Sequence, residues 1–226
     1  MKDLIAVTIG DVEGIGIHLL LKEWLKGNIK NFILITNLTI FNKLNILNKS
    51  KINIINNNNE FEKYNNDKIN ILNIKTKNKN TNTIDSLNIA YNYTKKGMFI
   101  GIITLPLNKK KINKFVNKSF IDQTTFFSKL ENNNRTNMIF YFRNKFFVPL
   151  TIHIELKSVH NYFKKKQYIF NKIKSLNETI INDFGIKNPK ILISGINPHA
   201  GENGIISKDD NKYIKPIVNL LKKNKI

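Results

Sequence analysis

Short apolar runs that alternate with helix-like stretches constrain the fold of this chain most. Each run has four to seven residues, which is far shorter than a membrane-spanning helix and typical of a buried strand bounded by turns. In the first half these runs are Leu4–Thr8, Phe32–Thr36, Ile52–Ile55, Ile69–Ile74 and Met98–Thr104. Strands that alternate with helices favour an α/β fold, with a mostly parallel sheet and helices on both of its faces.

Helical periodicity separates several of these runs. His18–Lys26 has apolar residues at helical spacing and ends at Gly27, a typical C-cap residue. Phe41–Leu47 and Thr83–Lys96 show the same pattern, whereas the low-complexity segment Lys75–Asn82 predicts an exposed loop.

The second half of the chain predicts a similar alternation. We expect strands at Asn137–Phe142, Phe146–Ile154 and Lys190–Ser194, and helices at Lys165–Asp183 and Asp209–Lys223. Ligands in such folds bind in the loops that follow the carboxyl ends of the strands. Those loops are therefore the first place to look for functional residues.

The charge of the chain is strongly positive. Its 226 residues hold 37 Lys and Arg against 16 Asp and Glu, a formal net charge of +21. Lysine is spread through every segment and arginine occurs only twice, although arginine is the usual residue for bidentate contacts to nucleic acid. Codon bias is therefore the favoured origin of the charge, and we expect no nucleic-acid partner.

Other features of the composition exclude several protein classes. A hydrophobic fraction of 41% excludes a disordered polyelectrolyte. The absence of cysteine excludes disulfides, thiolate nucleophiles and zinc–thiolate sites. No leader-like segment or long apolar run is present, so we expect a cytoplasmic protein that does not interact with membranes.

Two loops carry the first candidate functional residues. Gly10–Gly16 follows the first strand, but its glycine spacing matches neither a dinucleotide fingerprint nor a P-loop, so a structural turn is favoured, with Asp11 as a candidate ligand contact. Thr104–Lys109 follows another strand and offers Asn108 and Lys109. Lys109 also opens a run of three lysines, and a ligand contact and a solvated side chain are equally consistent with that pattern.

Histidine provides the second set of candidates. His153 and His199 each follow a predicted strand, whereas His18 and His160 are more typical of surface residues. Two neutral imidazoles form part of a divalent-metal site, which usually requires at least three protein ligands.

The order of these segments resembles the 4-hydroxythreonine-4-phosphate dehydrogenase family of pyridoxal phosphate biosynthesis. Five family motifs align in order with this chain. They are G-D-P-A-G-I-G-P-E with Gly10–His18, T-x-P-I-N-K with Thr104–Lys109, G-H-T-E with Asp122–Thr125, T-T-H-x-P-L with Leu150–Leu156, and G-L-N-P-H-A-G-E-x-G with Gly195–Gly204. The last block is the most specific of the five.

The resemblance implies both a fold and a reaction. The fold is that of isocitrate and isopropylmalate dehydrogenases, and the protein is a cytoplasmic homodimer. The reaction is the oxidation of 4-phosphooxy-L-threonine to 2-amino-3-oxo-4-phosphooxybutanoate, which decarboxylates to 3-amino-2-oxopropyl phosphate. It uses NAD or NADP and a divalent metal (zinc, magnesium or cobalt). By motif, His153 and His199 are metal ligands, and Gln123 and Thr124 contact the small phosphorylated substrate.

The sequence also departs from the family pattern. Gln123 replaces a substrate-binding histidine, so it can form hydrogen bonds but cannot carry a proton near neutral pH. The family's third metal histidine and later substrate-binding residues fall beyond Ile226. We therefore expect one truncated unit over 1–226 that lacks the family's C-terminal third, with a first α/β lobe at about 1–120 and a second at about 121–226. The alternatives are an impaired or inactive descendant that keeps a metabolite-binding groove and, less favoured, a basic nucleic-acid-binding protein.

Overall fold

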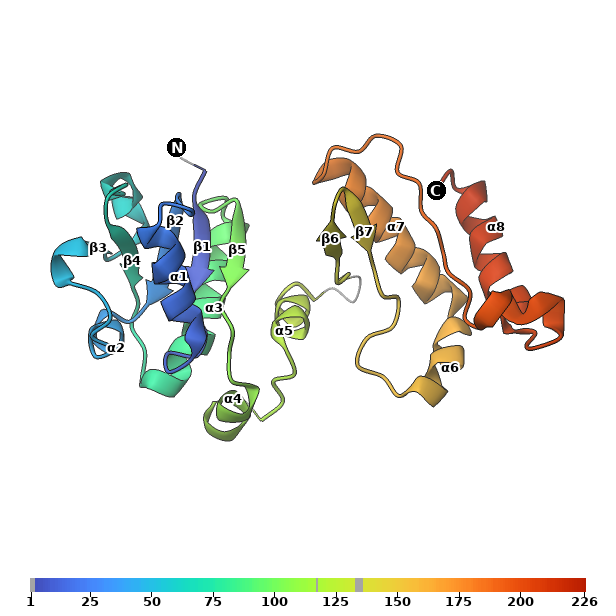
Figure 1. Ribbon diagram of the computed structural model, residues 1–226, viewed down its shortest axis with the longest axis horizontal. Coiled ribbons are helices and arrows are strands. Elements are labelled where there is room, and N and C mark those ends of the chain that lie inside the picture. Colours follow the sequence, from blue (N-terminus) through green and yellow to red (C-terminus); the bar gives the residue numbers. More distant parts are fainter. Residues whose placement is uncertain (1–2, 117, 133–135) are drawn as a thin grey trace. The chain divides into compact units, whose positions relative to one another are not determined.

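The computed structural model describes residues 3–116, 118–132 and 136–226. It divides into an N-terminal unit, residues 1–127, and a C-terminal unit, residues 128–226, and Figure 1 labels the elements of each. The two units are described separately. In the part of the chain that the structure describes, none of the helices is both long and apolar enough to cross a membrane.

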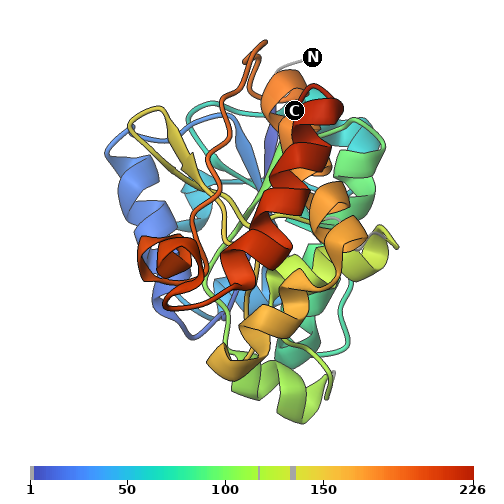
Figure 2. The same cartoon turned by 90° about the vertical axis from the view of Figure 1, so that its right-hand side faces the viewer.

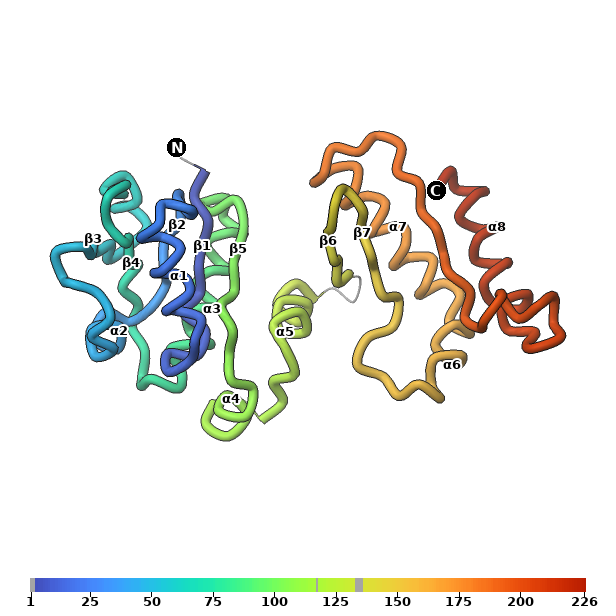
Figure 3. Tube along the Cα trace, in the orientation of Figure 1, coloured from blue at the N-terminus to red at the C-terminus, as the bar shows by residue number. Residues whose placement is uncertain are grey.

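The N-terminal unit is built on a five-stranded parallel sheet in the order β3-β4-β2-β1-β5. Figure 3 shows β1 between β2 and β5. The strands are β1 (Ile5–Thr8), β2 (Phe32–Thr36), β3 (Ile52–Ile55), β4 (Ile69–Asn73) and β5 (Gly101–Thr104). The five apolar runs are thus confirmed as strands. Thr8 pairs with Ile35 and with Thr104, so the carboxyl ends of the three neighbouring strands are level.

Helices cover both faces of this sheet, as the sequence predicted. Helix α1 (Ile15–Leu25) packs Ile17 and Leu21 on one face, where α2 (Leu38–Asn42) adds Phe41. Helix α3 (Lys79–Lys95) packs Ala90 on the opposite face. Every residue of β2 is buried, because this strand lies inside the sheet and has helices on both sides.

Three helices begin earlier than predicted, and the first of them, α1, starts at Ile15 and not at His18. Helix α3 starts at Lys79 and not at Thr83, so the expected exposed loop Lys75–Asn82 is wrong in its second half. The reason is a capping box: the Asn78 side chain accepts hydrogen bonds from the backbone amides of Asn80 (2.9 Å) and Thr81 (3.2 Å). Helix α2 likewise begins after a capping residue, Asn37, and ends before the predicted Leu47.

Polar residues on the inner side of α3 bind the ends of the central strands. The Ser86 hydroxyl accepts a hydrogen bond from the Ile9 amide (3.2 Å) and donates one to the Ile35 carbonyl (2.8 Å). The Thr83 hydroxyl donates to the Gly10 carbonyl (2.6 Å). Ser86 and Thr83 are buried, so these bonds satisfy backbone groups that have no access to water.

Two further helices, α4 (Lys109–Phe115) and α5 (Gln123–Leu130), follow β5. Ile112 of α4 packs with Leu87 of α3 and with Phe120 in a separate small core. This core places the start of α4 beside the start of α3, next to the carboxyl ends of the strands.

The C-terminal unit is mainly helical. Its helices are α6 (Val159–Phe163), α7 (Lys166–Asn182) and α8 (Lys215–Lys223), and a π-helical turn, Asp210–Ile214, precedes α8. Helices α7 and α8 lie side by side in Figure 2, and Ile169, Ile173 and Ile217 form the centre of their shared core. The predicted helix Lys165–Asp183 is confirmed to within one residue at each end.

The strands predicted in this unit are mostly wrong. Asn137–Phe142 and Phe146–Ile154 shrink to a short antiparallel hairpin of β6 (Phe140–Phe142) and β7 (Lys145–Phe147). Lys190–Ser194 forms no strand. Ile191 and Ile193 pack against the helical core while Leu192 is 94% exposed. Alternation here reflects contact with the helices, not pairing with a neighbouring strand.

Lys172 of α7 is a buried charged residue of the C-terminal unit. Lys172 is only 4% exposed, and its ammonium group donates a hydrogen bond to the Leu150 carbonyl (3.1 Å). Burial lowers the pKa of Lys172 below its usual value of 10.5. The bond links α7 to the segment that leads to His153.

Replacing Ser86 by alanine should lower the free energy of unfolding by about 1–3 kcal/mol, because two buried backbone groups lose their partner. Urea denaturation monitored by circular dichroism measures this change. Asn92→Ala, at an exposed position of the same helix, is the matched control and should stay within about 0.5 kcal/mol of the wild type. An equal effect of the two variants would contradict the role given to Ser86.

Replacing Lys172 by methionine should remove a pH-dependent part of the stability. Because its pKa is lowered in the folded state, the unfolded chain binds more protons between that lowered pKa and 10.5, and wild-type stability rises with pH in this window. In thermal unfolding from pH 7 to about 10, the stability of the wild type should rise relative to that of Lys172→Met. Lys174→Met, at an exposed site, should run parallel to the wild type. A constant difference between wild type and Lys172→Met would refute this explanation.

Candidate functional site

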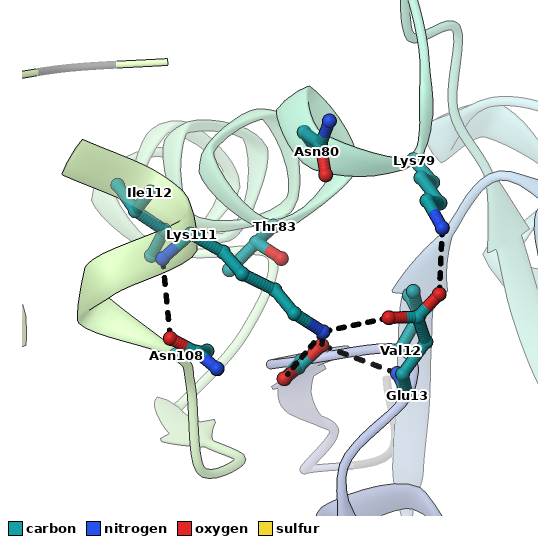
Figure 4. Close-up of a pocket in the computed structure, with 9 residues that line it drawn as sticks. Val12, Glu13, Lys79, Asn80, Thr83, Asn108, Lys111 and Ile112 are labelled. Atoms are coloured by element: carbon teal, nitrogen blue, oxygen red, sulfur yellow. Dashed lines mark hydrogen bonds and ion pairs between the residues drawn. The ribbon is translucent and has the colours of Figure 1, made fainter. Parts of the chain in front are cut away.

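A hollow lies at the carboxyl ends of β1 and β5 in the N-terminal unit, and we call it the strand-end hollow (Figure 4). Three short segments form its wall: the loop after β1, the first turns of α3, and the start of α4. The lining residues are Asp11, Val12, Glu13, Lys79, Asn80, Thr83, Asn108, Lys111 and Ile112. Sequence reasoning predicted ligand contacts at this edge of a parallel sheet.

The two sequence motifs that form the hollow are bound directly to each other. The Asp11 amide donates a hydrogen bond to the Pro106 carbonyl (2.8 Å). Gly10 has a φ of +66°, and a Cβ atom at this position would overlap the Pro106 carbonyl oxygen. Only glycine fits there without moving the neighbouring loop. The loop after β1 therefore forms a tight turn against the neighbouring loop, and this turn positions Asp11.

Four charged side chains form a network across the hollow. The Lys111 ammonium lies 3.2 Å from both carboxylate oxygens of Asp11 and 2.7 Å from Oε2 of Glu13. The Lys79 ammonium lies 2.6 Å from Oε1 of Glu13. Hydrogen bonds from Lys111 and then from Lys79 lower the pKa of Glu13 to about 2, and the bond to Glu13 raises the pKa of Lys111. Glu13 is therefore ionised at any physiological pH.

The interior of the hollow is small in this arrangement. Its volume is about 20 Å³, which is room for one or two water molecules. A ligand group larger than water enters only if one of the lining side chains moves.

The structure brings together two of the three candidate residues of these loops. Asp11 and Asn108 line the hollow, whereas Lys109 is exposed and does not. The Asn108 side chain accepts a hydrogen bond from the Lys111 amide (3.1 Å) and so caps α4. The lysine that enters the hollow is Lys111, the third of the run that Lys109 opens.

The candidate substrate contacts Gln123 and Thr124 are the first residues of α5 and are half-buried. Neither lines the strand-end hollow. Buried Asp122 precedes them and accepts a hydrogen bond from the Thr125 amide (2.7 Å), which fixes the start of the helix.

A second hollow lies in the C-terminal unit, and we call it the histidine hollow. Its volume is about 480 Å³, within the range of small-molecule sites. His199, Glu202, buried Asp210 and Lys215 contribute its ionisable groups, and apolar residues such as Ile193 lie beside them.

The loop that presents His199 has an unusual backbone. His199, Ala200, Gly201, Glu202 and Asn203 all have φ between +45° and +76°, the left-handed region that favours glycine. At Gly201 a Cβ atom would overlap the Ser207 carbonyl oxygen, so no other residue fits there without a shift of the backbone.

Buried Asp210 holds the start of this loop. One of its carboxylate oxygens accepts a hydrogen bond from the Ile196 amide (2.8 Å), and the other accepts from the Asn197 amide (3.3 Å) and side chain (3.4 Å). The family block of residues 195–204 is therefore fixed by a carboxylate outside it.

The described residues do not assemble a three-ligand metal site. His153 is exposed, has a φ of +55° and does not line the histidine hollow. Within residues 3–116, 118–132 and 136–226, no group of three or more His, Asp or Glu side chains is close enough to hold a metal ion. His153 and His199 thus provide at most two of the donors that such a site requires.

Several residues of the strand-end hollow were missed by sequence reasoning. Lys79 belongs to the segment taken as a loop, and Glu13 and Lys111 were not singled out. The capping box at Asn78 was a sequence signal for Lys79. Pairing of Glu13 with Lys111 joins positions 98 apart in the chain and has no local signal.

Comparison with known proteins gives a consistent family. Residues 28–226 match the family model "Pyridoxal phosphate biosynthetic protein PdxA". The chain is 34% identical over 131 residues to the 4-hydroxythreonine-4-phosphate dehydrogenase of Aquifex aeolicus, covering 58% of this chain and 40% of that one. The enzyme of the same name from Pseudoalteromonas translucida is 32% identical over 139 residues, covering 61% and 41%. The matches therefore span about 40% of the length of these relatives.

Solved structures show the same fold. The 4-hydroxythreonine-4-phosphate dehydrogenase of Klebsiella pneumoniae superposes with a TM-score of 0.84 at 21% identity, covering all of this chain and 73% of that one. A terephthalate 1,2-cis-dihydrodiol dehydrogenase of Burkholderia xenovorans gives a TM-score of 0.63 at 17% identity, covering 98% and 70%. At these identities the likeness concerns the fold alone.

Replacing Asp210 by alanine should loosen the loop of residues 195–204, because the Ile196 and Asn197 amides lose their acceptor. Hydrogen exchange of these two amides should speed up by about tenfold or more, as measured by NMR. Asp209→Ala removes a neighbouring carboxylate for which no bond to this loop is seen in the described structure, and it should leave both exchange rates within about twofold of wild type. Unchanged exchange in Asp210→Ala would show that the loop does not depend on it.

Proposed function

Because the chain belongs to the pyridoxal phosphate biosynthetic protein PdxA family, we propose that it takes part in oxidising 4-phosphooxy-L-threonine with NAD or NADP. The product, 2-amino-3-oxo-4-phosphooxybutanoate, decarboxylates to 3-amino-2-oxopropyl phosphate. The proposal also includes that the chain acts on a small phosphorylated substrate, forms a homodimer and is located in the cytoplasm.

The observation that carries this proposal is the loop that bears His199. It contains the most specific family block, it lines a hollow of metabolite size, and buried Asp210 holds its start. Residues kept in left-handed conformations concentrate at functional sites, because the surrounding structure must stabilise them.

The proposal gives individual residues roles by motif. Gln123 and Thr124 contact the substrate, and Asp11, Asn108 and Lys109 are candidate contacts in the ligand loops. Gln123 can donate and accept hydrogen bonds but does not move a proton. His153 and His199 are the candidate ligands of zinc, magnesium or cobalt. Since the described residues form no cluster of three donors, we derive no catalytic step through a metal ion.

A second candidate function is a descendant that binds the metabolite without turning it over. Two observations favour it: a glutamine at position 123, where the family motif has histidine, and the absence of a three-donor cluster in the part of the chain that the structure describes. The histidine hollow supports binding under either function.

An oxidation assay separates the two functions. The chain is mixed with 4-phosphooxy-L-threonine, NAD or NADP, and each of the three metals, and the reduced nicotinamide is followed by its absorbance. An active enzyme should lose at least about 100-fold in kcat/KM in His153→Ala/His199→Ala, a loss of about 2.7 kcal/mol in transition-state stabilisation. His18→Ala/His160→Ala changes two other exposed histidines and should retain activity.

Absence of turnover above the His153→Ala/His199→Ala level would reject the dehydrogenase proposal. Calorimetric titration with the same substrate then decides the second function. Binding without turnover supports the non-catalytic descendant, and absence of both turnover and binding rejects both functions.

A further inference from the structure

Two lysines from different helices converge on one carboxylate in the strand-end hollow. Lys79, the first residue of α3, binds one oxygen of Glu13 at 2.6 Å, and Lys111 of α4 binds the other at 2.7 Å. Figure 4 shows Lys111 approaching the Glu13 carboxylate from the left and Lys79 approaching it from above. Two ammonium groups, each on its own oxygen, form the arrangement that an oxyanion ligand requires.

We propose that Lys79 and Lys111 form a phosphate-binding site and that the Glu13 carboxylate occupies this site when no phosphate is bound. The inference deepens the proposed function, because it assigns a phosphate subsite and a built-in competitor to the strand-end hollow. It assigns roles to Glu13, Lys79 and Lys111, which the family motifs leave without one.

The Glu13 carboxylate is well suited to leave. The side chains of Glu13, Lys79 and Lys111 are 49%, 58% and 36% exposed, and ion pairs at such exposure contribute little to stability because water and salt screen them. A phosphate group carries more charge than a carboxylate and has three acceptor oxygens. Its oxygens can therefore replace both of the Glu13 contacts.

Lys111 remains in position when Glu13 leaves. Lys111 is also bound by Asp11 through two 3.2 Å contacts, and the Asp11 side chain is only 16% exposed. The Asp11 amide is in turn bound to Pro106. Lys111 is thus held by a group that does not need to move.

Charge also favours an anion in this place. With Glu13 present, two lysines face two carboxylates and the cluster is neutral. Without it, two lysines face Asp11 alone and the cluster carries one positive charge, on a chain whose net charge is +21. This positive charge attracts a phosphate group, which carries more negative charge than the carboxylate it replaces.

The helix N-terminus of α3 does not make this site. The Asn78 side chain already accepts the hydrogen bonds of the Asn80 and Thr81 amides. The phosphate would be held by the two ammonium groups, so the site depends on Lys79 and Lys111 themselves.

Titration with inorganic phosphate tests the proposal, using the full chain without substrate, nicotinamide or metal. Glu13→Gln removes the competing carboxylate and should tighten phosphate binding about 3- to 10-fold. This is the factor by which Glu13 lowers the fraction of molecules whose two lysines are free to bind phosphate. The change is measured by NMR shifts of the amides around residue 111. Glu23→Gln is the matched control, because Glu23 forms an ion pair with Lys26 at similar exposure elsewhere in the same unit. It should change the affinity less than about twofold.

Removing the lysines in the Glu13→Gln background completes the test. Lys79→Gln and Lys111→Gln should each weaken phosphate binding about tenfold or more, whereas Lys26→Gln in that background should not. Circular dichroism verifies that each variant is folded. If Lys111→Gln unfolds, the phosphate affinity of Lys79→Gln, which changes an exposed side chain, is the test.

Two results would overturn the proposal. Equal phosphate affinity in Glu13→Gln and Glu23→Gln would show that Glu13 does not occupy a phosphate site. Equal affinity in the lysine variants and the Lys26 control would show only general attraction to a basic surface. Failure of the dehydrogenase assay with intact phosphate binding would reject the proposed function and leave this site standing.

Discussion

The N-terminal unit depends on the polar side chains that α3 places beneath the ends of the sheet. Where β1 and β2 stop, their backbone groups lose the sheet's hydrogen bonds, and side chains of Ser86, Thr83 and Asn82 replace them. Buried backbone groups without partners are strongly unfavourable, so these three residues allow the chain to leave the sheet and turn. The strand-end hollow lies directly above this layer, and the same first turns of α3 carry Lys79 into its wall.

The sequence predicted the parallel sheet because its apolar runs had few alternatives. A short run such as Phe32–Thr36, apolar at its first four positions, is typical of a strand buried on both faces. Lys190–Ser194 has similar composition but forms no strand, since Ile191 and Ile193 are covered by helices and no neighbouring strand pairs with it in the described structure. Apolar periodicity reports which side of a segment is covered. It does not report whether the backbone finds a partner.

The candidate site was predictable to the extent that it follows from strand ends. Asp11 and Asn108 line the hollow because each lies in the loop after a strand, and their contact with a ligand stays a prediction. The lysines that complete the network were not, since Lys79 and Lys111 meet Glu13 across 66 and 98 positions of sequence. A lysine-rich chain makes this harder, because most of its lysines are solvated and the sequence does not distinguish them from the two that converge.

The two hollows illustrate two ways of preparing a site. In the histidine hollow the backbone carries the strain: four non-glycine residues in the left-handed region are each unfavourable by about 1–2 kcal/mol, and the hydrogen bonds of Asp210 help to offset this. His199 is therefore presented in one conformation before any ligand arrives. In the strand-end hollow the backbone turn is fixed by Gly10 and the charges remain movable. A rigid loop favours selection by shape, whereas exposed ion pairs favour exchange of one anion for another.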